Sequence, residues 1–247
     1  MKLTVVGCSG SYPGPDSPAS CYIVEVAGSR VLLDLGNGSL GALQRYADLF
    51  EVDAVLITHL HVDHYVDLCS YYVVRRYHPC GTPPPIPVYG PSGTAEQFAR
   101  AYGGISTEEL SQIFEFRDHA DAYGLGPFDV STTKVSHPVE AYAIRLDHAG
   151  RALTYSGDTG ECDGLVTLAR GSDLLLAEAA FQEGGDNPPG LHLTGRQAAD
   201  HAKRADVGQL VITHVPPWHD ALRTFAEAQE AYDGEASLAR SGAVYEV

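Results

Sequence analysis

Residues 58–64, "THLHVDH", place three histidines and an aspartate in seven positions, directly after the apolar run "DAVLI". Alternate residues of an extended chain project to the same side, so we expect His59, His61 and Asp63 to lie together. His64 follows immediately. Imidazole and carboxylate groups are ligands of zinc, manganese and iron, and two ions can share four ligands that a single ion cannot easily use. The stretch therefore predicts a metal-binding loop, with a histidine-rich polar turn as the alternative.

Three distant segments add candidate ligands at the ends of strand-like runs. "KVSHPVEAY" contains His137, "LTYSGDTG" contains Asp158, and "LVITHVPPW" contains His214. Any one of them alone is more simply explained as a turn residue with an ordinary hydrogen bond. Ligands of catalytic centres commonly lie on loops that a rigid scaffold positions. Four such segments in one chain favour a catalytic metal centre.

The composition is that of a folded globular chain. It has 247 residues, of which 44% are hydrophobic and 19% are charged, and this is enough to bury a large core. Strand-like and helix-like segments interleave along the whole length, with no repeat and no linker. We therefore predict one α/β domain over residues 1–247.

The charge balance restricts the partners. There are 32 acidic and 16 basic residues, which give a formal net charge of -16 and disfavour a dedicated DNA or RNA binder, tRNA included. The five cysteines are scattered, odd in number and without a CxxC pair, which favours free thiols in a reducing compartment. The start "MKLTVVG" resembles a strand, and no segment is long enough to span a membrane. We expect a cytoplasmic protein.

Runs rich in Val, Ile, Leu and Tyr predict the strands, among them "LTVVG", "CYIVEV", "RVLLDL", "AVLIT", "IPVYG", "FDVSTTKV", "AYAIRL", "ALTYSG", "DLLLAEA", "LVITH" and "AVYEV". Helices are predicted over residues 63–77, 92–102, 106–114, 194–205 and 220–233. The third and fourth open with the capping-box pairs Ser106/Glu109 and Thr194/Gln197.

The ordered set HxHxDH, a downstream histidine, the aspartate of "GDTG" and a last strand-end histidine resembles the metallo-β-lactamase superfamily over nearly the whole chain. The resemblance implies a four-layer αβ/βα sandwich, in which two mixed β-sheets are flanked by helices and a dinuclear site lies at one sheet edge. Carried over by position, it implies one metal on His59, His61 and His137, a second on Asp63, His64 and His214, and Asp158 as the bridge. Zinc is the expected ion, with manganese and iron as alternatives. Asp34 in "LLDLGNG" matches an early aspartate that supports the ligand loop, although a turn carboxylate explains it equally well.

Two later segments resemble the ribonuclease Z branch and its phosphodiesterase relatives. "LLLAEAAF" supplies Glu178 and "LHLTGRQAA" supplies His192. The resemblance implies that this pair transfers a proton to the leaving oxygen, with Asp63 as a further catalytic residue. A hydrogen bond at a helix start is the simpler alternative for His192. Aspartate at position 158, in place of cysteine, disfavours an antibiotic-hydrolysing lactamase, and the basic glycine-rich arm of ribonuclease Z is absent.

The favoured hypothesis is a two-metal phosphodiesterase that acts on a small phosphodiester such as a cyclic nucleotide or an RNA 3′ end. The alternatives are lactone, ester or thioester hydrolysis or iron-dependent oxidation in the same fold, and a non-catalytic metal-binding module. A structural zinc site needs only four closed ligands, which disfavours the module. Ser11, Tyr12 and Trp218 lie in loops that could border the pocket, although surface packing is the simpler explanation. The family resemblance also implies a homodimer.

Overall fold

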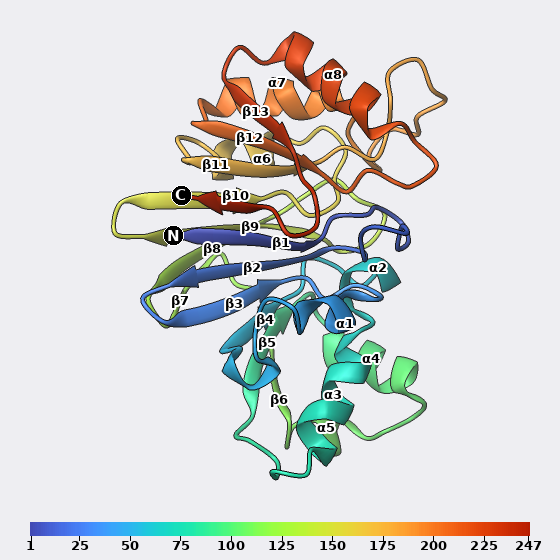
Figure 1. Ribbon diagram of the computed structural model, residues 1–247, viewed down its shortest axis with the longest axis vertical. Coiled ribbons are helices and arrows are strands. Elements are labelled where there is room, and N and C mark those ends of the chain that lie inside the picture. Colours follow the sequence, from blue (N-terminus) through green and yellow to red (C-terminus); the bar gives the residue numbers. More distant parts are fainter.

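Two seven-stranded mixed sheets dominate the structure, a computed structural model that describes residues 1–247 (Figure 1). The first sheet has the order β14-β1-β2-β3-β4-β5-β6, with β14 (Val244–Glu246), β1 (Lys2–Gly7), β2 (Cys21–Val26), β3 (Ser29–Leu33), β4 (Ala54–Leu56), β5 (Ile86–Gly90) and β6 (Phe114–Asp118). The second has the order β13-β12-β11-β10-β9-β8-β7, with β13 (Glu235–Leu238), β12 (Gln209–Thr213), β11 (Leu174–Glu178), β10 (Arg151–Tyr155), β9 (Tyr142–His148), β8 (Phe128–Lys134) and β7 (Ala122–Leu125).

Each sheet has a parallel half and an antiparallel half. β3 to β6 run parallel, as do β10 to β13, whereas β14, β1, β2 and β3 pair antiparallel, as do β7, β8, β9 and β10. The two chain ends lie together, because the amino group of Met1 donates to the carbonyl of Val247 at 2.7 Å (Figure 1).

Helices cover the outer face of each sheet. The first sheet carries α1 (Ser39–Leu43), α2 (Val62–Tyr65), α3 (Leu68–Tyr77), α4 (Thr94–Tyr102) and α5 (Thr107–Leu110), with a short 3-10 turn at Leu49–Glu51. The second carries α6 (Asp163–Leu168), α7 (Gly195–Ala205) and α8 (Ala221–Ala231). Figure 1 shows α7 and α8 at the top, beside the second sheet, and α1 to α5 at the lower right, beside the first sheet. None of these helices is long and apolar enough to cross a lipid bilayer.

Three apolar cores separate the four layers. One lies between the first sheet and its helices, one between the sheets, and one between the second sheet and its helices. Neighbouring strand residues serve different cores: Leu32 faces the helices, whereas Leu33 faces the other sheet. This explains why the inner strands are continuous apolar runs, since both of their faces are buried. The predicted αβ/βα sandwich is confirmed.

Both predicted capping boxes are confirmed, at Ser106/Glu109 and Thr194/Gln197. The helix predicted over residues 106–114 is wrong in its second half. It ends at Leu110, because Phe114 begins β6 and pairs with Ile86 of β5, so sheet pairing outweighs helical periodicity.

The helix predicted over residues 63–77 is two helices. Leu35 interrupts it: its N–H donates to the carbonyl of His64 at 2.7 Å, and its carbonyl accepts from the N–H of Asp67 at 3.1 Å. These are the groups that a continuous helix would use for its own hydrogen bonds. The break fixes the segment after residues 58–64 against the turn after β3, which contains Asp34 and Leu35.

Candidate metal centre

The predicted ligands converge because several strands end at one edge of the sandwich. β3, β4, β8, β10 and β12 point the same way, and they lead into Asp34, the loop at 58–64, His137, Asp158 and His214 respectively. The carboxyl ends of strands in α/β sheets are common ligand sites, since side chains there leave the sheet without being covered by the next turn. In Figure 1 this edge carries α2 and the loop after β1.

The first ligand group contains three imidazoles. Nδ1 of His61 lies 3.1 Å from Nε2 of His59 and 3.2 Å from Nε2 of His137, and Asp158 Oδ2 lies 3.6 Å from His59 Nε2. Nδ1 of His137 donates to the carbonyl of Leu191 at 2.9 Å, which leaves a lone pair on Nε2.

The second group contains Asp63, His64, His214 and both oxygens of Asp158. His64 Nε2 lies 3.2 Å from Asp158 Oδ1 and 3.6 Å from Asp63 Oδ2. His214 Nε2 lies 3.4 Å from Asp158 Oδ2 and 3.6 Å from Asp63 Oδ2. Asp158 is shared by both groups, which is the arrangement expected of a bridging carboxylate.

The donor set fits divalent cations. Three buried atoms at the centre, His64 Nε2, Asp158 Oδ1 and His214 Nε2, have no hydrogen-bond partner. A buried polar atom left without a partner costs about 1–3 kcal/mol, and one shared divalent cation would satisfy all three atoms. Nitrogen and oxygen donors without sulfur suit zinc, manganese or iron.

The pKa directions support this fit. Burial and the neighbouring His64 hold the pKa of His59 well below its usual value against the effect of Asp158, so His59 keeps a lone pair. Burial also lowers the pKa of His64, but Asp158 and Asp34 outweigh it and raise that pKa well above its usual value. Without a cation, His64 therefore carries the proton that balances the carboxylates, and metal binding displaces it.

Asp34 supports the second group from outside. It is fully buried and accepts hydrogen bonds from His64 Nδ1 at 2.7 Å, the N–H of Thr58 at 2.7 Å and the hydroxyl of Tyr155 at 2.9 Å. Its φ of 58° and the φ of 57° at His214 lie in the left-handed region, which is uncommon outside glycine and concentrates at functional sites. The structure thus places Asp34 behind His64.

Glu178 and His192 form a third group with Asp158. His192 Nδ1 donates to Glu178 Oε1 at 2.8 Å and lies 3.9 Å from Asp158 Oδ2. Glu178 is fully buried and also accepts from the N–H groups of Thr159 and Ala180, both at 2.9 Å. Burial lowers the pKa of His192, but Glu178 outweighs it and raises that pKa to about 9. His192 is therefore an imidazolium at neutral pH.

These groups line an open pocket of about 340 Å³. Its walls are Ser11, Leu60, His61, Val62, Asp63, Asp158, His192 and His214. No lysine or arginine is among them, so the fixed positive charge in the pocket comes from imidazole alone. Bound cations and His192 are therefore the groups available to an anionic substrate.

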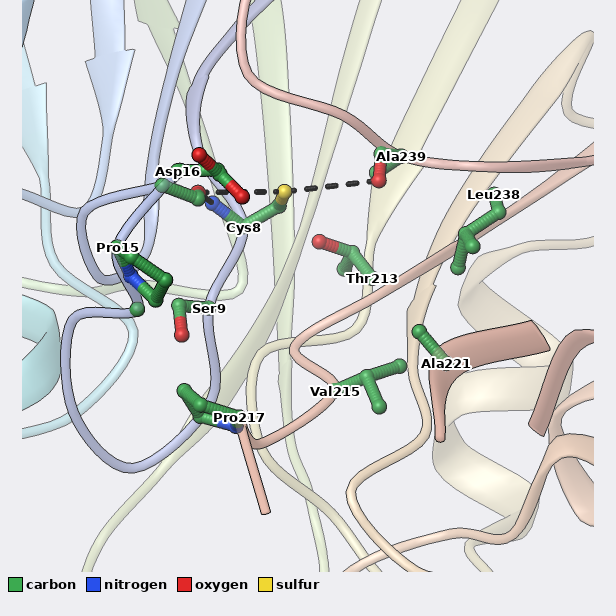
Figure 2. A pocket seen from close by; sticks show the side chains of 12 residues that line it. Cys8, Ser9, Pro15, Asp16, Thr213, Val215, Pro217, Ala221, Leu238 and Ala239 are labelled. Atoms are coloured by element: carbon green, nitrogen blue, oxygen red, sulfur yellow. Dashed lines mark hydrogen bonds between the residues drawn. The ribbon is translucent and has the colours of Figure 1, made fainter. Parts of the chain in front are cut away.

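A second pocket of about 280 Å³ lies on the other side of the His214 segment (Figure 2). Figure 2 shows Cys8, Ser9 and Pro15 on one wall and Val215 and Pro217 on the other. None of the seven predicted metal ligands lines it. It marks the contact between the N-terminal loop and the segment after His214.

Sequence reasoning missed three residues that support the site. Ser20 lies 3.0 Å from Nδ1 of His214, Thr58 binds Asp34, and Tyr155 binds Asp34 across the two sheets. Thr58 opens the stretch 58–64 itself, and Ser20 directly precedes the strand-like run "CYIVEV". Tyr155 carries no local signal, because its partner is 121 positions away.

A sandwich of two mixed sheets with a His/Asp cluster at their common edge is a fold with a candidate metal centre. The chain belongs to the β-lactamase superfamily, whose domain profile, "Beta-lactamase superfamily domain", matches residues 29–215. This assigns it to the metallo-hydrolases and supports divalent metal binding at the cluster.

Known proteins extend the match over the whole chain. An uncharacterized protein of Mycobacterium leprae is 42% identical, covering 100% of this chain and 89% of that one. A ribonuclease Z of Myxococcus xanthus is 28% identical, covering 100% of this chain and 98% of that one. The crystal structure of the metallo-β-lactamase fold protein YhfI of Bacillus subtilis superposes with a TM-score of 0.90 at 28% identity, covering 100% and 99%.

Proposed function

We propose that this single-domain chain is a dinuclear phosphodiesterase that acts on a small phosphodiester such as a cyclic nucleotide or an RNA 3′ end. His59, His61 and His137 would hold one divalent cation, Asp63, His64 and His214 the other, and Asp158 both. Zinc suits this nitrogen and oxygen set, with manganese and iron as alternatives. Such cations, when bound, activate water and stabilise charge on a phosphoryl oxygen.

The observation that carries the proposal is the Glu178–His192 pair in the pocket. Cleavage of an alkyl phosphodiester expels an alkoxide, which needs a proton as it leaves. His192 has one to give at neutral pH, because Glu178 raises its pKa to about 9. General acid catalysis of this kind contributes about 10²–10⁴-fold. A ribonuclease Z among the relatives also acts on nucleic-acid phosphodiesters, as its name states.

The negative charge of the chain favours a small substrate over tRNA. A chain of net charge -16 repels a polyanion, whereas one phosphodiester can be neutralised by cations at the cluster. The wall that contains Asp63 and His192 has no lysine or arginine that could follow a phosphate backbone.

The test is a substrate panel with metal quantification. Protein loaded with zinc or manganese is assayed with bis(p-nitrophenyl) phosphate, cyclic nucleotides, dinucleotides, a tRNA precursor, lactones and thioesters. We expect phosphodiester turnover and two metals per chain, with both reduced in Asp158→Ala and unchanged in Asp200→Ala, an exposed aspartate on α7. Efficient lactone or ester hydrolysis without phosphodiester turnover would replace the proposal with that alternative.

A further inference from the structure

Two exposed aromatic side chains contact each other beside the pocket. The rings of Tyr12 and Trp218 are 5.2 Å apart between centroids and inclined by 32°. Tyr12 is 41% exposed and Trp218 is 59% exposed, although each has a partner ring. The pair therefore presents apolar surface that the fold itself does not bury.

The pair belongs to two chain segments that also line the metal-site pocket. Ser11, which precedes Tyr12, and His214, four residues before Trp218, both line the pocket. The two segments are tied by backbone hydrogen bonds, from the N–H of His214 to the carbonyl of Cys8 at 3.0 Å and from the N–H of Gly10 to that of Val215 at 3.2 Å. The segments that line the metal-site pocket therefore lead directly into the aromatic pair.

The turn that carries Tyr12 is firmly held. Ser11 has a φ of 63°, the N–H of Tyr12 donates to the carbonyl of Gly10 at 2.7 Å, and Ser9 Oγ donates to the carbonyl of Tyr12 at 2.7 Å. A β-carbon on Gly10 would lie 2.2 Å from the carbonyl oxygen of His214, so this contact requires glycine. Backbone strain of this kind persists where the surrounding structure enforces it.

The loop after His214 supports the turn from the other side. Ser9 forms an isolated β-bridge with Val215, and a β-carbon added to Gly14 would lie 3.3 Å from Cγ of Pro217. Two stiff loops therefore present the ring pair in one fixed arrangement. A preformed surface binds a rigid flat group with little loss of conformational freedom.

The charges that line the pocket favour an uncharged group on the substrate beside its phosphate. Because no lysine or arginine lines it, groups of the substrate beyond the phosphate must be bound without charge. Val62, 56% exposed, adds apolar surface to the same pocket. A flat, largely uncharged ring attached to one phosphate matches both features.

We propose that Tyr12 and Trp218 form a stacking surface for the nucleobase of the substrate, so that the substrate class is a nucleoside with a single phosphodiester. The inference rests on the proposed phosphodiesterase function and adds that the site binds the nucleobase of its substrate. Base stacking on aromatic side chains tolerates any base, so discrimination is between nucleosides and other phosphodiesters rather than among bases.

The first test uses fluorescence, because Trp218 is the only tryptophan in the chain. Zinc-loaded protein is titrated with AMP and, separately, with ribose 5-phosphate, which has the same phosphate and no base. We expect saturable quenching by AMP alone, weakened on the order of ten-fold in Tyr12→Ala and restored in Tyr12→Phe. Tyr77→Ala, at an aromatic side chain 65% exposed on α3, is the control and should bind as the parent does. Equal quenching by both ligands, or by neither, would overturn the inference.

The second test compares two substrates with one leaving group, thymidine 5′-(p-nitrophenyl phosphate) and methyl p-nitrophenyl phosphate. Trp218→Leu and Tyr12→Ala should raise KM for the thymidine ester on the order of ten-fold, with kcat nearly unchanged, and should alter the methyl ester less than about two-fold. Equal effects on both esters would contradict stacking. Stacking would also be contradicted if the variants hydrolysed both esters as the parent does but had a different molecular mass in light scattering. Tyr12 and Trp218 would then form an interface between two copies of the chain. If AMP quenches but neither ester is hydrolysed, base binding holds and the phosphodiesterase proposal fails.

Discussion

His192→Gln tests the acid role of the third group most directly. Glutamine retains a hydrogen-bonding group of similar size but has no proton to transfer. In the parent protein, a pKa of about 9 makes the imidazolium about 100-fold more abundant than the neutral ring at pH 7. The 2.8 Å contact with Glu178 keeps Nδ1 occupied, so Nε2 carries the transferable proton. Loss of general acid catalysis lowers the rate by about 10²–10⁴-fold, provided that the leaving group needs a proton.

The assay therefore compares two leaving groups in the same variant. Hydrolysis of a cyclic nucleotide, followed by chromatography, expels an alkoxide, whereas bis(p-nitrophenyl) phosphate expels a phenolate that is stable near neutral pH. We expect His192→Gln to lose about 10²–10⁴-fold in kcat on the first substrate and less than about ten-fold on the second. His78→Gln, at an exposed histidine, should change neither rate. Equal losses on both substrates would show that His192 acts by positioning or by metal support, and the general-acid argument would be refuted.

Three further outcomes follow from the same structure. Glu178→Gln removes the charge that raises the pKa of His192, so the alkaline limb of the rate profile, where the acid loses its proton, should move down from about pH 9; an unmoved limb would assign it to another group. Asp34→Asn weakens the 2.7 Å contact to His64 and should lower zinc affinity about 10–100-fold in a chelator competition; unchanged affinity would leave Asp34 a role in folding alone. Burial lowers the pKa of His119 to about 4, so the unfolded chain takes up a proton at this residue before the folded chain does, and the free energy of unfolding declines as the pH falls from 6.5 toward 4. In urea unfolding, His119→Gln should reduce this decline in the free energy of unfolding by at most about 3 kcal/mol. The same pH dependence in the variant and the parent would contradict the argument.

Local signals predicted much of the secondary structure, and their failures have a common cause. The boxes at Ser106 and Thr194 were recognised because the capping hydrogen bonds join residues three apart. The helix over 106–114 was overextended because Phe114 is held by a strand 28 positions earlier, at Ile86. The break before α3 depends on hydrogen bonds with Leu35, and because Leu35 lies outside residues 63–77, the pattern of that segment could not predict the break.

The sequence by itself determined the donor chemistry and its order along the chain: the spacing in "THLHVDH", then His137, Asp158 and His214, each after an apolar run that ends at a turn. Those features are local, since strand ends and ligand types can be recognised within a few residues. Only the tertiary structure decided that Tyr155 reaches Asp34 across the sandwich and that Tyr12 meets Trp218. These contacts join positions separated by up to 206 residues (218 less 12), and their geometry comes from how two sheets pack, which no short stretch of the chain encodes.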